Sequence, residues 1–118
     1  NEMKPVRSSS ILVHHKEKII PIKTEEVALF YIQHQATYLT TFSGKTYFVN
    51  KTLDQIEQIT GMGFFRANRQ FLINRNAVRD ASHHLSRKFS VNLTIPFEHS
   101  VTISKEKLGD FLNWLSQS

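Results

Sequence analysis

The sequence predicts a mainly β domain of antiparallel strands with two short helices, and three features carry that prediction. Apolar and polar residues alternate from Phe89 to Ile95, which is typical of a strand with one face in the core and the other in water. The run from Val27 to Ile32 is wholly apolar and rich in β-formers, which indicates a strand buried on both faces. Apolar residues at helical spacing follow Thr52 and Ser104, so we expect a short helix at each place.

The chain is predicted to hold one domain behind a short tail. A length of 118 residues suits a single domain with a modest core. Residues 1–10 contain proline, charges and serines, a composition typical of a linker. Because the chain begins with Asn1 instead of methionine, we expect it to be a fragment in which residues 1–10 tether the domain, residues 11–118, to another one.

The domain is expected to open with a hairpin. Strands at Ile11–Val13 and Ile19–Ile22 flank a polar stretch, and Pro21 favours an edge position because proline cannot donate a ladder hydrogen bond. A short helical turn at residues 24–26 then leads into the buried strand, which we extend to residues 27–34.

A second hairpin and the first helix are expected to follow a polar turn at Gln33–Thr37. Strand Tyr38–Phe42 is followed by Ser43-Gly44-Lys45, which returns the chain into a strand at Thr46–Val49. The helix then begins with a capping box, in which a hydroxyl accepts from an orphan N–H and a glutamine reaches back. Thr52 and Gln55 would form this box. Leu53, Ile56 and Ile59 would form the buried face of the helix, and Gly61 and Gly63 would end it.

The C-terminal part is expected to contain three strands and the second helix. Val78–Leu85 and Lys88–Ile95 are predicted to pair around Ser86-Arg87, and Pro96 ends the second of them. Ser100–Ile103 is the last predicted strand. A helix begins at Ser104, and its predicted apolar face follows the i, i+3, i+4, i+7 rule: Leu108, Phe111, Leu112 and Leu115.

The composition favours a soluble protein with a polyanionic partner. Hydrophobic residues make up 40% of the chain and charged residues 21%, and neither a membrane span nor a signal peptide is predicted. The absence of cysteine excludes disulfides and thiolate metal sites and fits a cytoplasmic protein. The net charge is +5, and between Val27 and Arg79 the acids are Asp54 and Glu57, both on the first predicted helix. The loops of this half are therefore purely basic.

The segment Phe64–Asn74 combines a strongly apolar composition with two arginines and two asparagines. Its apolar side chains can anchor it, because burial of each contributes roughly 1.5–3 kcal/mol. Arg66, Asn68 and Arg69 would then have to leave the core. Arginine binds guanine or phosphate through two hydrogen bonds and asparagine binds adenine, so the segment suits the reading of DNA.

This segment, FFRANRQFLIN, resembles the signature of the LytTR domain, the β-rich DNA-binding module of bacterial response regulators, which runs roughly F-x-R-x-H-R-S-Y/F-x-V-N. Asn68 stands where the family usually has histidine, and Gln70 where it usually has serine. The likeness extends from about Ile19 to Leu115. Five residues fit the signature: Phe64, Arg66, Arg69, Phe71 and Asn74.

The resemblance implies an elongated LytTR-like β fold that places loop residues, not a recognition helix, in successive grooves of double-stranded DNA. It implies the output domain of a bacterial transcriptional regulator in a two-component system, with a receiver or sensor domain upstream. Two copies on the direct repeats of a promoter are expected, with a dimer on DNA as one arrangement. No cofactor and no metal are implied.

The resemblance also implies that Arg69 faces the major groove with Asn68 beside it. An amide can bridge two atoms of adenine, so Asn68 keeps base reading plausible but removes the pH dependence of a histidine. From the residues alone, a solvated charge and a turn residue explain Arg69 and Asn68 equally well. For Arg66 the alternatives are a brace inside the segment and a contact to DNA.

The start of the C-terminal helix is a second candidate contact. Ser104 is a good N-cap, yet Lys105 and Lys107 lie in the first turn, where the helix dipole disfavours each positive charge by about 0.3–1 kcal/mol. A phosphate there would accept from free backbone N–H groups and pair with Lys105. The alternative is that Glu106 offsets an exposed lysine. Ser104-Lys105 also matches the Ser-Arg corner of the family, with lysine in place of arginine.

The remaining candidate contacts have weaker support in the sequence than Arg69 and Lys105. Thr37 lies in the predicted turn Gln35-Ala36-Thr37, where the family commonly has a contacting loop, although a threonine that merely closes a turn fits nearly as well. Three further bases are phosphate candidates, each explained equally well as a solvated charge: Lys45, Lys51 and Arg75.

The sequence argues against an enzyme. His14-His15 and His83-His84 are adjacent pairs, not the spacings that bring two rings to one metal, and the sequence has neither a P-loop nor a nucleophile elbow. The alternative to DNA binding is a β-rich interaction module that holds a protein or small ligand through apolar edges. A salt titration of the affinity distinguishes DNA binding from binding through apolar edges, because binding through phosphates weakens steeply as the salt concentration rises.

Overall fold

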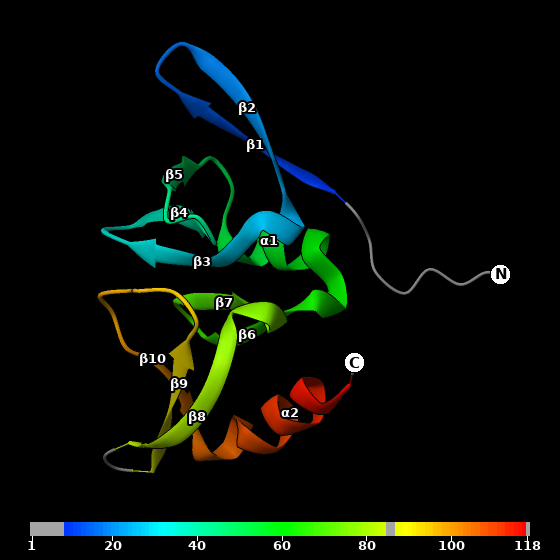
Figure 1. Cartoon of the computed structure of the whole chain (residues 1–118), viewed down its shortest axis with the longest axis vertical. Helices are drawn as coiled ribbons and strands as arrows, with labels where there is room; N and C mark the ends of the chain where they lie inside the picture. The colour runs from blue at the N-terminus through cyan, green and yellow to red at the C-terminus, as the bar shows by residue number, and fades with distance from the viewer. Residues whose placement is uncertain (1–8, 85–86, 118) are drawn as a thin grey trace, which may run out of the picture.

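The computed structural model describes residues 9–84 and 87–117 and has the mainly β architecture that the sequence predicts (Figure 1). The tail predicted at residues 1–10 therefore lies mostly outside the described residues, although Ser10 already belongs to the first strand. Neither helix within these ranges is long and apolar enough to cross a membrane. The strands and helices are β1 (Ser10–His15), β2 (Lys18–Lys23), β3 (Val27–Gln33), β4 (Ala36–Thr41), β5 (Thr46–Val49), α1 (Leu53–Thr60), β6 (Phe64–Asn68), β7 (Phe71–Asn74), β8 (Val78–His84), β9 (Lys88–Leu93), β10 (Val101–Ser104) and α2 (Lys105–Ser116).

The strands form three antiparallel sheets. The largest has the order β5-β4-β3-β7-β6, and the others are the hairpin β1-β2 and the sheet β10-β9-β8. Strand β3 lies between β4 and β7, and residues 27–31 are buried, as predicted for a strand covered on both faces. The predicted first hairpin is confirmed, and Pro21 pairs with Leu12 in a sheet of only two strands.

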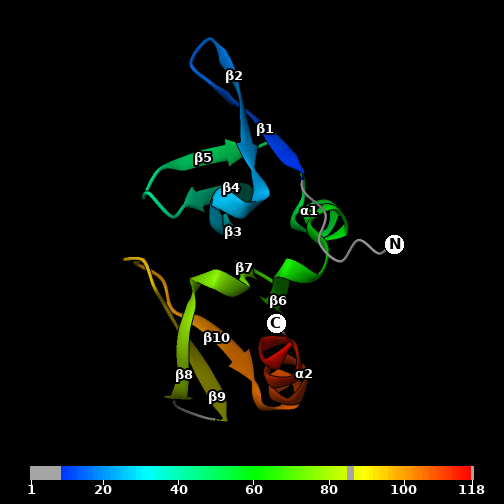
Figure 2. The ribbon, with the colours of Figure 1, turned by 45° about the vertical axis from the view of Figure 1, so that its right-hand side comes forward.

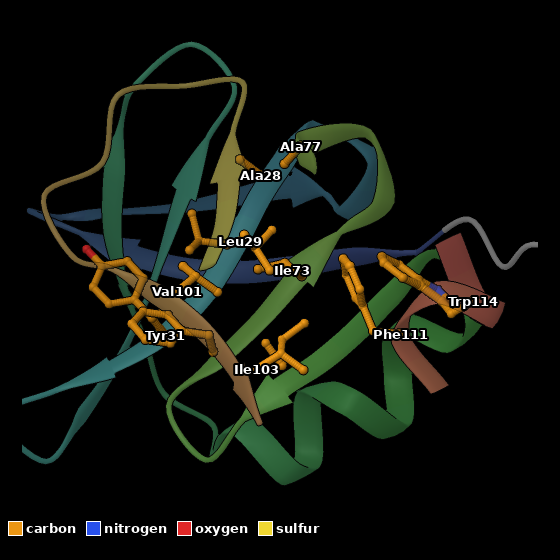
Figure 3. Packing of buried hydrophobic residues seen from close by; sticks show 12 residues of the cluster. Ala28, Leu29, Tyr31, Ile73, Ala77, Val101, Ile103, Phe111 and Trp114 are labelled. Atoms are coloured by element: carbon orange, nitrogen blue, oxygen red, sulfur yellow. The ribbon is translucent and has the colours of Figure 1, made fainter. Parts of the chain in front are cut away.

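Each face of the five-stranded sheet packs against a separate hydrophobic core. On one face the hairpin β1-β2 and helix α1 pack over a cluster that includes Phe30, Leu39 and Leu72. On the other face β8-β9-β10 and α2 cover a second cluster, in which Phe111 and Trp114 of α2 point toward the sheet (Figure 3). The alternation of β3 serves both cores, because Phe30 faces one cluster and its neighbours Leu29 and Tyr31 face the other. Figure 2 shows β6 between α1 and α2.

Local capping chemistry sets the start of α1. The Thr52 hydroxyl accepts from the Gln55 N–H at 3.1 Å, and the Gln55 side chain accepts from the Thr52 N–H at 2.9 Å. The predicted capping box is therefore confirmed. Gly61 ends the helix with a φ of 66°, a conformation that favours glycine.

The predicted position of the β3–β4 turn was wrong. The turn consists of His34 and Gln35 alone, with φ values of 52° and 64°, and β4 already begins at Ala36. Positive φ at both central residues is the geometry of a two-residue hairpin turn, whose twist matches that of the flanking strands. Thr37 consequently lies inside β4, where it pairs with Ile32 on one side and Val49 on the other.

The C-terminal elements differ from the prediction in several details, and β10 covers Val101–Ser104 in place of Ser100–Ile103. Strand β9 ends at Leu93, two residues before the predicted end, and the N–H of Thr94 beyond it donates to the carbonyl of Ala77 at 2.8 Å. In α2, Phe111 and Trp114 are the buried residues, whereas Leu112, predicted on the apolar face, is 49% exposed. Leu108 and Leu115, also predicted on this face, are half-buried and pack against the same cluster, so Leu112 is the predicted residue that lies off the packed face.

Candidate nucleic-acid interface

The segment Phe64–Asn74 is the hairpin β6-β7, and its tip carries Arg69. Strand β7 is buried at every position, which anchors the hairpin between β3 and β6. The pairing of β6 with β7 shifts between Arg66 and Asn68, so Asn68 lies opposite Phe71 across a turn of two residues. That bulge leaves Ala67 buried and Arg69 exposed at the turn.

The amide of Asn68 is committed to internal hydrogen bonds. Its Nδ2 donates to the carbonyl of Thr102 in β10 at 2.7 Å, and its Oδ1 accepts from the N–H of Gln70 at 2.8 Å. The first bond joins the five-stranded sheet to the three-stranded sheet, and the second closes the turn. Asn68 therefore holds the turn beside β10, and the turn exposes the side chains of Arg69 and Gln70.

Arg66 braces the same turn from inside, the first of the two roles that the sequence left open. Its Nε donates to the carbonyl of Asn68 at 2.9 Å and its Nη2 to the carbonyl of Arg69 at 3.0 Å. Its Nη1 donates to the carboxylates of Asp54 at 2.7 Å and Glu57 at 2.9 Å, both on α1. One guanidinium thus links the turn to the first helix, and both acids of this region are paired.

The start of α2 lies next to this hairpin. Ser104 has the extended backbone of an N-cap (φ −70°, ψ 158°), but its hydroxyl makes no capping bond within the described part of the chain. Lys107 donates to the carbonyl of Arg66 at 2.8 Å and lies 5.6 Å from the centre of the Phe65 ring. Lys105 is exposed, and its N–H donates to the carbonyl of Arg87 at 3.1 Å. Of the two lysines in this first turn, Lys105 is therefore the one available to a partner.

These elements enclose an open hollow of about 550 Å³ with a basic lining, which we call the basic hollow. Sequence reasoning missed Lys88, an exposed residue of β9 that pairs with Ser104 in the ladder. The pairing of β9 with β10 depends on the tertiary structure. The local sequence around Lys88 therefore gives no signal that this residue lies beside Ser104. The hollow brings the predicted residues Asn68, Arg69 and Ser104 together, and its lining is Arg66, Ala67, Asn68, Arg69, Gln70, Lys88, Thr102, Ser104 and Lys107.

The β3–β4 turn lies beside the β6–β7 turn. The N–H of Ile32 donates to the carbonyl of Gln70 at 3.0 Å, so the tips of both hairpins lie at one end of the five-stranded sheet. His34 and Gln35 are the exposed residues of this tip, whereas Thr37 is buried in β4 with 7% of its surface exposed. Lys51 is exposed and follows β5, whose last residue Val49 pairs with Thr37. It therefore belongs to the same end of the sheet.

Two predicted phosphate contacts lie elsewhere. Lys45 follows the far end of β4 and lines a separate hollow of about 570 Å³ together with Glu25 and Glu26. Arg75 is half-buried; its Nη2 donates to the carbonyl of Trp114 at 2.8 Å, and its guanidinium lies 5.6 Å from the Trp114 ring centre. This geometry indicates that Arg75 fixes the last turns of α2, where cations complement the helix dipole.

The described residues contain no group of three or more His, Cys, Asp or Glu side chains that could hold a metal ion. One histidine of each adjacent pair in the sequence packs against an aromatic ring. His15 packs against the ring of Tyr47 at 5.3 Å, and His83 against Phe89 at 4.7 Å. The chemistry available at the basic hollow is therefore that of cations, hydroxyls and backbone groups, which suits an anionic partner.

Comparison with known proteins agrees with this geometry. The family model of the LytTr DNA-binding domain matches residues 17–116 of the chain. A solved structure of a LytTr DNA-binding domain of a response regulator from Bacillus cereus is similar, with a TM-score of 0.76 at 18% sequence identity. The match covers 92% of this chain and 97% of that chain, so the two share a fold. A comparison with curated protein sequences gave no match.

Proposed function

Because the chain belongs to the LytTr DNA-binding domain family, we propose that it binds double-stranded DNA in a sequence-specific manner, as the output domain of a transcriptional regulator. The observation that carries this proposal is the basic hollow, which Arg69 and Ser104 both line although they lie far apart in the sequence. Lys105 directly follows Ser104, so the exposed cations of two sheets and one helix share one surface.

In this proposal Arg69 reads base edges and the other groups hold the DNA backbone. Arg69 is exposed at the tip of a braced turn, and a guanidinium can bind the O6 and N7 atoms of guanine together. Lys88, Lys105 and the Ser104 hydroxyl suit phosphate oxygens, and Lys51 extends the basic surface toward the β3–β4 turn. Asn68 positions the reading turn through its two internal hydrogen bonds.

The charge balance around the hollow supports an anionic partner. The nearby acids Asp54 and Glu57 both pair with Arg66, which offsets one of their two negative charges. Glu106 is the acid in the first turn of α2. Against it stand the exposed cations Arg69, Lys88 and Lys105. A polyanion approaching this end of the sheet would meet a net positive surface.

We also propose the arrangement that the family suggests: two copies on direct repeats of a bacterial promoter, in the cytoplasm, under the control of a receiver or sensor domain in a two-component regulator. Duplexes with one or two copies of a selected site test this. Sedimentation should show one protein per single site and two per double site, and a single protein on the double site would contradict it.

Selection of bound sequences from a random duplex pool tests DNA binding and returns the preferred site. With that site, Arg69→Ala should lower specific affinity by about 1–3 kcal/mol and should change affinity for a scrambled duplex much less. Arg79→Ala is a charge-matched control, because Arg79 is exposed on β8 and pairs with Asp80 at 3.8 Å. Equal losses on both duplexes for Arg69→Ala would exclude base reading by this residue.

A further inference from the structure

Arg66 connects the reading turn to both helices. Its side chain is only 18% exposed and donates to four acceptors, the carbonyls of Asn68 and Arg69 and the carboxylates of Asp54 and Glu57. Its own carbonyl accepts from Lys107 in the first turn of α2. The same residue is therefore tied to α1, to the β6–β7 turn and to the helix start that presents Lys105.

We propose that Arg66 is a positioning residue that fixes Arg69 relative to Lys105, and that the carboxylates of Asp54 and Glu57 hold it in that position. The assignment rests on the proposed DNA binding. Base reading needs a donor held to within a fraction of an ångström, and an exposed turn of two residues does not supply that rigidity by itself. The guanidinium fork supplies it, because its fixed plane sets the direction of each bond at once.

Charge masking is the competing explanation. Two carboxylates beside a DNA-contacting turn would repel phosphates, and the charge of Arg66 offsets half of theirs whatever its geometry. An exposed ion pair alone contributes little, and the Asp54 side chain is 85% exposed. Masking needs only a positive charge near α1, whereas positioning needs the bonds from Nε and Nη2 to the two turn carbonyls. A lysine can replace Arg66 in the first role but not in the second.

The first experiment compares Arg66→Lys and Arg66→Gln with Arg79→Gln, which removes the same charge from an exposed arginine on β8. Binding is measured on the selected duplex and on a scrambled one. Positioning predicts that both Arg66 variants lose roughly tenfold in the ratio of the two affinities, while Arg79→Gln keeps the wild-type ratio. A wild-type ratio for Arg66→Lys would overturn the proposal.

A second experiment separates the two explanations by removing the carboxylates. In a protein carrying Asp54→Ala and Glu57→Ala, no charge is left to mask. Masking predicts that the triple variant, which adds Arg66→Gln, discriminates between the two duplexes as the wild type does, whereas positioning predicts that discrimination by the triple variant is impaired. A triple variant with wild-type discrimination would overturn the proposal.

A measurement on the free wild-type protein needs no variant to fold. The Nε–H of Arg66 donates to the carbonyl of Asn68, so its NMR signal should exchange with water much more slowly than that of Arg79. Equal exchange rates would overturn the assignment even if DNA binding is confirmed. Conversely, a slow Arg66 signal in a protein that binds all duplexes equally would overturn the proposed function, and the positioning role would fall with it.

Discussion

Asn68 illustrates how one side chain joins two sheets. Its amide bridges the carbonyl of Thr102 and the N–H of Gln70, at 2.7 Å and 2.8 Å. Both partners lose a hydrogen bond when the amide is removed, and the side chain is half-buried, so water replaces it incompletely. The position that the family usually fills with histidine thus has a structural role in this chain.

Asn68→Ala should lower the free energy of unfolding by about 1–3 kcal/mol, because it leaves both partners unsatisfied. Urea denaturation followed by tryptophan fluorescence measures this. Asn92→Ala is the control; the Asn92 amide bonds to Asp80 on an exposed surface, so its loss should stay within about 0.5 kcal/mol. Unchanged stability of Asn68→Ala would contradict the joining role.

Arg75→Ala should act on folding and not on phosphate binding. The variant loses the hydrogen bond to the Trp114 carbonyl and the contact with the indole ring, which together contribute about 1–3 kcal/mol. The exposed Arg79→Ala should change stability by no more than about 0.5 kcal/mol. A stable Arg75→Ala protein whose DNA binding has become less sensitive to salt would instead support the phosphate contact that the sequence predicted.

The polar residue types in the apolar segment indicated which side chains would lie outside the core, but not which groups would be their hydrogen-bond partners. Arg66 and Asn68 follow the prediction that they do not enter the core, yet their partners come from α1 and β10. The Trp114 carbonyl that holds Arg75 is equally remote in the chain. Hydrogen bonds between distant segments depend on the tertiary arrangement, which local patterns do not encode.

At the scale of elements, the two-residue turn of β3-β4 carries backbone strain. His34 and Gln35 both have positive φ, a region that costs L-residues roughly 1–2 kcal/mol and that suits Asn-Gly far better. Polar composition indicated that a turn lies there. The exact positions were missed because neither residue is a typical member of such a turn.

Replacing His34-Gln35 by Asn-Gly should therefore raise the free energy of unfolding by about 0.5–1 kcal/mol. Thermal unfolding measures this as an increase in Tm. Gln33→Gly is the control, because Gln33 lies in β3, where glycine destabilises by about 0.5–1 kcal/mol. A lower Tm for the Asn-Gly variant would show that these side chains stabilise the turn by contacts that outweigh the strain.

At the scale of the molecule, one sheet with a core on each face places the proposed contact residues at one end. The wholly apolar run along β3 was enough to predict burial on both faces, and hydrophobic spacing was enough to predict both helices. The order of the strands was not predictable in this way, because the chain runs from the edge strand β5 through α1 to the opposite edge strand β6 before β7 pairs with β3. That order brings Arg69 beside Ser104 and leaves Lys45 at the opposite end with Glu25 and Glu26.

This separation makes the salt dependence of binding a test of the whole arrangement. The logarithm of affinity should fall with the logarithm of salt concentration by about 0.9 for each phosphate that the protein neutralises. Lys105→Ala should reduce the slope by about one unit, whereas Lys45→Ala, which removes the same charge from the far end of β4, should leave it unchanged. Equal effects of the two lysines would contradict a localised interface. A wild-type slope near zero would instead favour binding of a protein or small ligand through an apolar surface.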